Sequence, residues 1–383
     1  MDFTVSNEWQ VLVDTLRSFC EDEVDPLWRE IEESNAIPEG LLEKAGQLGL
    51  FGLSIPEEYG GLGLPMVAKA LVYEQLGRTH AGFTSIIGTH CGIGVSVIVA
   101  AGSEEQKQRY LPSLASGEVI GAFALTEPEA GSDAGNLRLR AIRDGEGWRL
   151  TGTKHYITNS KIAGLFTVFA RTGESGGKGI SAFVVEAGAP GFEVGRAQTT
   201  MGLRGSHVAE LSFDGCWVPD DQMIGAPGTG YQAALSTLAQ GRVGIAARCV
   251  GAASRATELA LTFATQREQF GSKIAEFQMI QAYLAEMAAE TEAARHLAYY
   301  AAWLLDQGGS ARREAAMAKL IATETYGRVV DKAVQIHGGM GYCTETEIEH
   351  FYRDARITRI YEGTSEIQKL VIARDMIRKV RGR

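Results

Sequence analysis

The stretch WRLTGTKHYIT, residues 148–158, alternates apolar and polar side chains with a period close to two, which is typical of a half-buried β-strand. Four more β-rich runs lie nearby, separated by glycine and Asp-Gly turns: VIGAFALT (119–126), LFTVFAR (165–171), GISAFVVEA (179–187) and VAELSFDGCWVP (208–219). Together these runs predict a β domain over residues 118–225.

On both sides of this domain the apolar period changes to that of a helix. Residues 66–76 show it before the β runs, and alanine-rich helical runs cover 231–265, 276–307 and 311–336 after them. A βαβ alternation is absent, which argues against a doubly wound sheet. We therefore predict an N-terminal helical domain (1–117), the β domain (118–225) and a C-terminal helical bundle (226–383).

The composition limits the class of protein. A chain of 383 residues is long enough for two or three domains, and a formal net charge of −10 argues against a general nucleic-acid or membrane-surface binder. The N-terminus lacks the apolar stretch of a signal peptide, and no run of about 18 uninterrupted apolar residues predicts a membrane span. Five cysteines are scattered singly, which favours a reducing compartment and argues against structural zinc. We expect a cytoplasmic protein without membrane insertion.

The sequence RIYEGTSEIQ, residues 359–368, places Glu362 on a tight bend before a helix. Gly363 permits the bend. Ser365 and Gln368 fit a capping box, which predicts a helix from Glu366. Apolar residues then recur at helical spacing and predict one buried face: Ile367, Leu370, Val371, Ile377 and Val380. From these residues alone, Glu362 is either a solvated or helix-stabilising loop carboxylate or a catalytic base in a fixed position.

Two stretches of the predicted β domain offer groups for ligand binding. FALTEPEAGSDAG (123–135) runs from a strand into a loop whose backbone N–H groups and hydroxyls suit an anionic or polar ring system. KHYITNS (154–160) places Tyr156 and Thr158 on one face of a strand, where a ring and a hydroxyl suit a flat cofactor. The alternatives are a surface loop and ordinary half-buried strand residues.

Two stretches of the helical region offer similar groups. In QREQFGSKIAEFQ (266–278), Arg267 beside Phe270 suits a phosphate and a ring, although a solvated arginine is the commoner case. In QIHGGMGY (335–342), paired glycines permit close approach to a ligand or simply end a helix. His337 has no partner at ligand spacing, so we assign it no metal role. GxGxxG, Walker A, HExxH and G-x-S-x-G motifs are absent.

Taken together and in this order, these stretches resemble the acyl-CoA dehydrogenase family over essentially the whole chain. LTEPEAGSDAG, QIHGGMGY and RDARITRIYEGTSEIQ carry the resemblance. It implies an α+β multidomain fold: an N-terminal helical domain, a middle antiparallel β domain and a C-terminal four-helix bundle. It also implies a homotetramer, with FAD between the β domain and the bundle and completed by a neighbouring subunit. An electron-transfer flavoprotein is the implied electron acceptor.

The resemblance implies α,β-dehydrogenation of an acyl-CoA thioester to the trans-2-enoyl-CoA. Glu362 matches the base of the short- and medium-chain branches, which takes the α-proton while hydride passes to flavin N5. The backbone N–H of the base and a ribityl hydroxyl of FAD polarise the thioester carbonyl. Other branches place the base on a bundle helix, at the position of Gly241 here, so this chain has only Glu362 for the role.

Further residues match family positions. Those matched to the cofactor are Phe123, Leu125, Thr126, Gly131, Ser132, Tyr156, Thr158, Arg267, Phe270, Gln278, Gln335, Gly338, Gly339, Thr364 and Glu366. Those matched to the substrate are Ser132, Arg242, Tyr361 and Gly363. No metal site is expected.

Three alternatives stay open. Many relatives have aspartate in a CoA contact where this chain has Ala239, so the substrate is alternatively an acyl thioester on a carrier protein. The same fold also serves acyl-CoA oxidases and flavin monooxygenases, and a non-catalytic flavoprotein is a third class. The floor of the acyl pocket is expected in FTSIIGTHCGIGVS (83–96), whose small residues do not fix the length or branching of the acyl chain.

Overall fold

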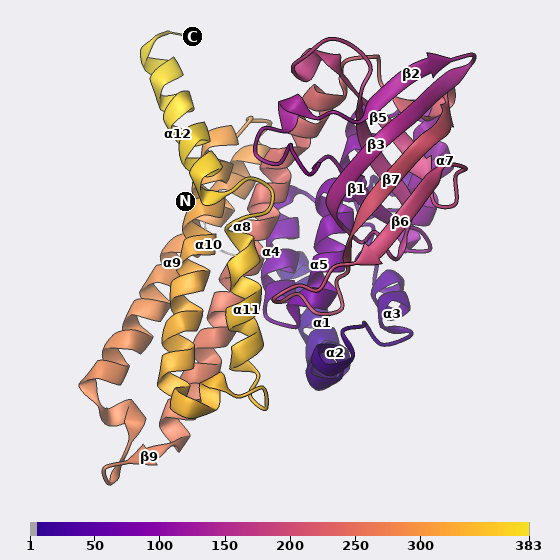
Figure 1. Cartoon of the computed structure of the whole chain (residues 1–383). Helices are drawn as coiled ribbons and strands as arrows, with labels where there is room; N and C mark the ends of the chain where they lie inside the picture. The colour runs from indigo at the N-terminus through magenta and orange to yellow at the C-terminus, as the bar shows by residue number, and fades with distance from the viewer. Residues whose placement is uncertain (1–5, 383) are drawn as a thin grey trace.

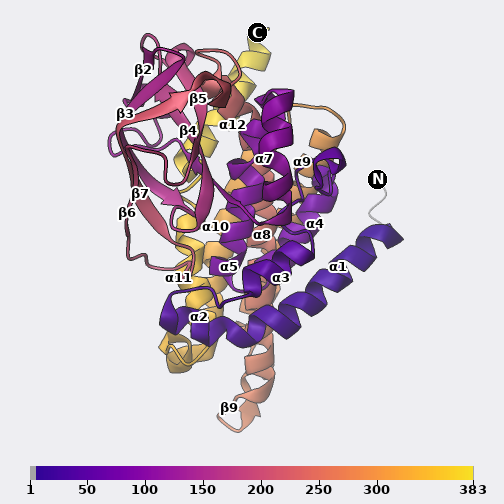
Figure 2. The same ribbon diagram turned by 90° about the vertical axis from the view of Figure 1, so that its right-hand side faces the viewer.

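The computed structural model describes residues 6–382 and shows a β-sheet on one side of two sets of helices (Figure 1, Figure 2). The N-terminal set comprises α1 (Asn7–Phe19), α2 (Trp28–Ser34), α3 (Leu41–Gln47), α4 (Met66–Gly77), α5 (Ala81–Thr89), α6 (Ser96–Ala101) and α7 (Glu104–Ser116). A π-helical turn, His90–Gly94, joins α5 to α6. The expected N-terminal helical domain is confirmed.

The segment Ala81–Ala101, which contains α5 and α6, is long and apolar enough to cross a membrane by length and composition. It has 21 residues and a mean hydropathy of 1.7, and 67% of its most apolar window is buried inside the fold. A core helix of a folded domain has the same properties. Its apolar side chains pack within the protein, and Phe83, Ile87 and Ile98 are among those that are fully buried.

The middle domain is one mainly antiparallel sheet with the order β6-β7-β3-β2-β4-β5-β8, in which β1 pairs with β4. Its strands are β1 (Ile120–Ala124), β2 (Arg140–Asp144), β3 (Gly147–Thr158), β4 (Ala163–Arg171), β5 (Ile180–Glu186), β6 (Phe192–Ala197), β7 (Val208–Pro219) and β8 (Met223–Ile224). The pairing of β1 with β4 and one residue pair between β2 and β4 are parallel, which a purely antiparallel sheet lacks. Phe192 makes an edge-to-face contact with Phe166 and a tilted contact with Phe213 in the core of this domain.

The C-terminal set is built around α8 (Gly230–Gln266), which packs against α9 (Gln278–Asp306), α10 (Arg312–His337) and α11 (Ile348–Thr358). A short hairpin of β9 (Glu268–Gln269) and β10 (Ser272–Lys273) forms the far tip of the bundle (Figure 1). Glycine brings α4 and α8 into backbone contact. A Cβ on Gly77 would lie 2.1 Å from the carbonyl oxygen of Arg248, and one on Gly251 would lie 1.8 Å from that of Glu74.

The last helix, α12 (Ser365–Val380), projects beyond the body of the molecule (Figure 1). The prediction that its apolar residues form a buried face is wrong for the single chain. Leu370, Ile377 and Val380 are 46%, 50% and 89% exposed, and the buried residues of the helix are Ser365 and Gln368. Periodicity shows that one face is apolar but does not show what covers that face.

The proposed domain boundaries fall in glycine turns. Gly117 lies between α7 and β1 with a φ of 79°, and Gly225 lies between β8 and α8 with a φ of 70°. A left-handed backbone at each position reverses the chain where one set of elements ends and the next begins. We keep 117/118 and 225/226 as the proposed boundaries.

Candidate active site

Two fully buried side chains, those of Lys319 and Gln368, hold the turn between α11 and α12 in place. Lys319 of α10 donates from Nζ to the carbonyl oxygen of Gly363 at 2.9 Å. Gln368 donates from Nε2 to the same oxygen at 2.8 Å and to the carbonyl oxygen of Glu362 at 3.3 Å. Both Glu362 (φ 50°) and Gly363 (φ 94°) have left-handed backbone, which is uncommon for a glutamate. These contacts therefore fix the direction of the Glu362 side chain.

The start of α12 differs from the prediction. Thr364, not Ser365, caps the helix by accepting from the N–H of Ile367 at 3.3 Å, so the helix begins at Ser365 and not at Glu366. Ser365 instead donates from its hydroxyl to Glu324 at 2.6 Å. The amide of Gln368 is occupied by the turn carbonyls, so it does not complete a capping box.

The carboxylate of Glu362 fills a space that only glycine leaves open. Its Oε2 atom is buried and has no hydrogen-bond partner in residues 6–382. A Cβ on Gly241 of α8 would lie 2.4 Å from Oε2 and 3.5 Å from a methyl carbon of Ile93. Any side chain at position 241 would therefore displace the Glu362 carboxylate from this position.

The surroundings of Glu362 combine burial with positive charge. Burial raises the pKa of Glu362, and Arg248, the strongest of three opposing cations, lowers it. The other two are Lys319 and Arg242. Burial also lowers the pKa of Lys319 to about 8. The site thus holds a carboxylate whose pKa lies above that of an ordinary glutamate, and three cations limit the rise.

Within residues 6–382, the backbone N–H groups of Glu362, Gly363 and Thr364 have no acceptor. The N–H of Tyr361 donates to the carbonyl oxygen of Ile357 at 3.1 Å, and that of Ser365 donates to Arg359 at 3.0 Å. For the N–H of Glu362 itself, the structure of residues 6–382 shows no acceptor. A carboxylate and an unused donor therefore belong to the same residue, in a turn that cannot rotate freely.

A segment of the N-terminal helical domain lies between the β domain and this turn. Asn159, which follows β3, donates from Nδ2 to the carbonyl oxygens of Ile86 at 3.1 Å and Gly121 at 3.3 Å. Ile93, a few residues beyond Ile86, is the side chain next to Gly241 and Glu362. The segment 86–93 therefore contacts strand β1 and the end of β3 on one side and helix α8 on the other.

The residues predicted to bind the cofactor in the β domain lie on these two strands and the loop after β1. Phe123, Leu125 and Thr126 are partly buried, and Gly131 and Ser132 are exposed in the loop. Tyr156 is 64% exposed and has a φ of 56°, because β3 contains a bulge between Lys154 and Ile157. The bulge turns an aromatic ring outward beside Thr158, which is partly exposed.

A buried ion pair joins these two segments, and the sequence did not identify it. Lys154 of β3 donates from Nζ to Oε1 of Glu127 at 2.7 Å and to the carbonyl oxygen of Leu125 at 3.1 Å. Glu127 also accepts from the backbone N–H groups of Arg138 and Leu139, the latter at 2.9 Å. Both side chains are almost fully buried, and burial lowers the pKa of Lys154 to about 8.

The other residues predicted to bind the cofactor lie at the opposite end of the bundle. They are Arg267, Phe270, Gln278, Gln335, Gly338 and Gly339, and all are exposed. Phe263 and His337 stack at 4.5 Å and bring the ends of α8 and α10 together there. Gly241 and Arg267 are separated by 26 residues of α8, or roughly 39 Å at 1.5 Å per residue. One chain therefore does not bring this set to Glu362.

The remaining predicted residues surround the turn. Thr364 is the N-cap described above, and Glu366 is exposed in the first turn of α12. Arg242 of α8 is buried with its Nε atom unpaired within residues 6–382. Tyr361 is partly buried, and burial raises its pKa above the usual tyrosine value. Ala239 is buried and 8% exposed, so it presents little surface to a ligand.

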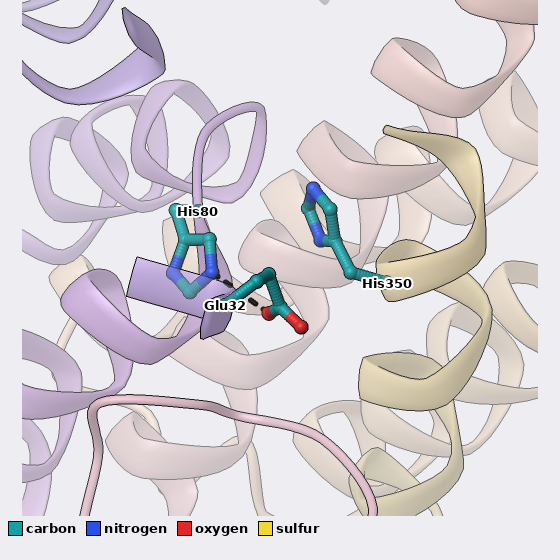
Figure 3. Close-up of side chains that lie close together, drawn as sticks. All are labelled: Glu32, His80 and His350. Carbon is teal, nitrogen blue, oxygen red and sulfur yellow. Dashed lines mark hydrogen bonds and ion pairs between the residues drawn. The ribbon is translucent and has the colours of Figure 1, made fainter. Parts of the chain in front are cut away.

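A third cluster, Glu32, His80 and His350, has the donor atoms of a metal site (Figure 3). Its hydrogen bonds argue against that role. His80 accepts at Nδ1 from the N–H of Gly82 at 3.2 Å, so Nε2 carries the proton and donates to Glu32 at 3.0 Å. The guanidinium of Arg353 is bonded to the other oxygen of Glu32. Burial opposes ionisation of Glu32, but these two hydrogen bonds hold its pKa at about 2. We assign the cluster a structural role.

Comparison with known proteins agrees with the fold and the site. The family models of the acyl-CoA dehydrogenase N-terminal, middle and C-terminal domains match residues 6–118, 122–216 and 228–377. An acyl-CoA dehydrogenase of Bacillus subtilis (strain 168) is 42% identical over 374 residues, covering 97% of this chain and 99% of the relative. The human mitochondrial short-chain specific acyl-CoA dehydrogenase is 43% identical over 373 residues, covering 97% of this chain and 90% of the relative.

Solved structures agree as well. Butyryl-CoA dehydrogenase from Megasphaera elsdenii has a TM-score of 0.96 at 36% identity and covers 99% of this chain and 100% of its own. A chain from a structure of the electron transferring flavoprotein of Acidaminococcus fermentans has a TM-score of 0.96 at 40% identity, with 99% and 100% covered. An acyl-CoA dehydrogenase from Bacillus anthracis complexed with FAD has a TM-score of 0.93 at 38% identity, with 99% and 68% covered.

The chain belongs to the acyl-CoA dehydrogenase family. It is an oxidoreductase that dehydrogenates acyl-CoA thioesters with FAD as its cofactor. The prediction of the family, the three-part fold and the class of reaction is confirmed.

Proposed function

We propose that Glu362 is the base that removes the α-proton of the acyl-CoA. The observation that supports this most directly is the position of its carboxylate. Oε2 is buried and unpaired within residues 6–382, in a turn that Lys319 and Gln368 hold in place. An unpaired buried acceptor is costly unless a ligand completes it. The α-proton of a bound thioester is a suitable partner for such an acceptor.

The same turn supplies the second requirement of the reaction. An α-proton is only weakly acidic, so the carbonyl oxygen must be stabilised as negative charge develops on it. The unused N–H of Glu362 is available for that oxygen. Burial raises the pKa of the carboxylate, which strengthens it as a base, and the nearby cations limit the rise.

The groups on β1 and β3 fit a flat, partly polar cofactor. The ring of Tyr156 is turned outward at the bulge, and Thr158 and the loop at 125–132 offer hydroxyls and backbone N–H groups beside it. We assign these residues to the flavin of FAD. When bound, the flavin accepts the hydride that leaves the β-carbon, so the product is the trans-2-enoyl thioester.

We assign the distal set to the pyrophosphate and adenosine half of FAD bound to another subunit. Phe270 is 96% exposed with a φ of 53°, and within residues 6–382 no carboxylate lies within 4 Å of Arg267. The separation of roughly 39 Å along α8 places the distal set far from Glu362 of the same chain. Within residues 6–382, no element covers the exposed apolar face of α12. A homotetramer, which provides both sets to each cofactor, accounts for these three observations.

Arg267→Ala is expected to lower FAD occupancy and leave the fold intact. A guanidinium–phosphate contact contributes about 1.5–3 kcal/mol, so the variant should lose most of its flavin on dilution. The matched control is Arg196→Ala, since Arg196 is also exposed but lies on β6, away from the distal set. Flavin absorbance per chain and light scattering measure occupancy and assembly. Full flavin retention in Arg267→Ala, or a flavin-loaded monomer, contradicts the assignment.

We further propose an electron-transfer flavoprotein as the acceptor and the cytoplasm as the location. Anaerobic addition of an acyl-CoA to the yellow protein should bleach the flavin, and the acceptor flavoprotein should restore the colour. Prompt release of H2O2 in air identifies an oxidase instead. Turnover of a carrier-protein thioester in preference to the matching acyl-CoA supports the carrier-bound alternative. Absence of bleaching with every thioester contradicts the proposed function.

A further inference from the structure

One face of α8 runs from Glu362 toward α5. Gly241, Gly244 and Arg248 are three, four and seven residues apart, so they share that face. Gly241 lies against the Glu362 carboxylate, as described above. A Cβ on Gly244 would lie 3.0 Å from the ring of Tyr73. Arg248 follows two helical turns after Gly241, or about 10.5 Å further along the helix axis.

The guanidinium of Arg248 lies under α5, in the segment expected to form the floor of the acyl pocket. A Cβ on Gly88 would lie 2.6 Å from Nη1 and 2.7 Å from Cζ of Arg248. Nη1 donates to the carbonyl oxygen of Thr84 at 3.3 Å. The glycine at position 88 therefore leaves the space that this guanidinium occupies. Figure 1 shows α5 beside α4, and the two helices are in contact.

Within residues 6–382, Arg248 forms no direct ion pair, unlike comparable arginines, although it interacts electrostatically with Glu362 at longer range. Arg295 is 2.9 Å from the carboxylate of Glu74, and Arg255 is 3.2 Å from that of Glu347. Within residues 6–382, no carboxylate lies within 4 Å of Arg248, and its five N–H donors make one hydrogen bond. Its side chain is only partly buried. A guanidinium that is partly buried and incompletely bonded is stabilised by an anion, because an unpaired charge away from water is unfavourable.

We propose that Arg248 binds a carboxylate at the far end of the acyl chain, so that the preferred substrates are CoA thioesters of short dicarboxylic acids. This inference rests on the proposed role of Glu362, which fixes where the α-carbon lies. A guanidinium pairs with a carboxylate through two parallel hydrogen bonds. Helical side chains lean toward the N-terminus of their helix, so the Arg248 head group lies less than 10.5 Å from the level of Gly241. A short acyl chain spans that separation.

Arg248→Met tests the proposal, because methionine is unbranched like arginine and has no charge. The purified flavin-loaded enzyme is assayed with glutaryl-CoA and adipyl-CoA, and with pentanoyl-CoA and hexanoyl-CoA as neutral counterparts. The wild type should prefer the dicarboxylic substrates. Arg248→Met also removes a cation that acts on Glu362, so both kinds of substrate should lose some activity. The loss of kcat/KM should be about 10²–10³-fold larger for the dicarboxylic substrates than for the neutral ones. Arg248→Lys keeps the charge and should retain part of the preference.

Binding provides a readout that does not depend on turnover. Unreactive thioether analogues with the same acyl ends should show the same loss of affinity in Arg248→Met, measured by calorimetry. Equal losses for both kinds of substrate, with a shifted pH profile, would mean that Arg248 acts only through Glu362 and would overturn the proposal. Turnover of neutral substrates alone by the wild type overturns it and leaves the proposed function intact. If no thioester reduces the flavin, the proposed function fails, and equal analogue affinities in wild type and Arg248→Met then overturn this inference too.

Discussion

Glu362→Gln is expected to bind FAD and acyl-CoA but to leave the flavin oxidised when substrate is added without oxygen. Glutamine keeps the size and polarity of the side chain, and neither ligand depends on its charge. The loss of a general base slows proton transfer by about 10²–10⁴-fold. Stopped-flow measurement of flavin bleaching at saturating acyl-CoA gives the rate, and spectral titration confirms that substrate is still bound. Bleaching at the wild-type rate would show that Glu362 is a residue of the turn and not the base.

The pH dependence of the wild type gives a second test of the same assignment. The base must be ionised in the free enzyme, so kcat/KM should fall as the pH falls through the pKa of Glu362. Burial raises that pKa, so the fall should occur above the range of an ordinary glutamate. Glu345→Gln is the matched control, since Glu345 is exposed and lies away from the turn. It should keep both the rate and the acid limb.

Lys154→Met is expected to destabilise the protein by about 3–5 kcal/mol, because it leaves Glu127 as a buried charge without its partner. The loop after β1 should also loosen, since Lys154 connects that loop to β3 through Glu127 and Leu125. Chemical denaturation measures the loss of stability. The release of flavin on dilution measures how far the loop after β1 has loosened. A change below 1 kcal/mol with unchanged flavin retention would contradict this reading.

The matched control removes both charges at once. Glu127→Gln combined with Lys154→Met leaves no unpaired ion, and glutamine can still accept one of the two backbone N–H bonds. The double variant should therefore recover a large part of the stability that Lys154→Met loses. A double variant as unstable as the sum of the two single variants would show that the pair does not act as a unit.

Local patterns were enough to predict the architecture, whereas the role of Glu362 as the base came from the family resemblance and remains a proposal. The period of two across 118–225 and the helical periods on both sides predict the order of the domains, because each depends on neighbours in the sequence. The bend at Glu362 and Gly363 was predicted for the same reason. The cap of α12 was misplaced by one residue, since Thr364 and Ser365 both carry a hydroxyl and only the fold shows which one faces the helix.

The supporting residues were not predictable in this way, because their contacts join distant parts of the chain. Lys319 reaches Gly363 across 44 positions, and Lys154 reaches Glu127 across 27. A lysine within a helical or β pattern is normally solvated, so nothing local distinguishes these two. Arg248 was overlooked for the same reason: its importance depends on Gly88, which belongs to another domain.

The glycine at position 241 also has a consequence for the ancestry of this enzyme. A side chain there and the carboxylate of Glu362 compete for one volume, since a Cβ at 241 would lie 2.4 Å from Oε2. Within this fold, a side chain at position 241 and the present position of the Glu362 carboxylate are therefore incompatible. A transfer of the base from the turn to the helix would require the Glu362 carboxylate to leave this position.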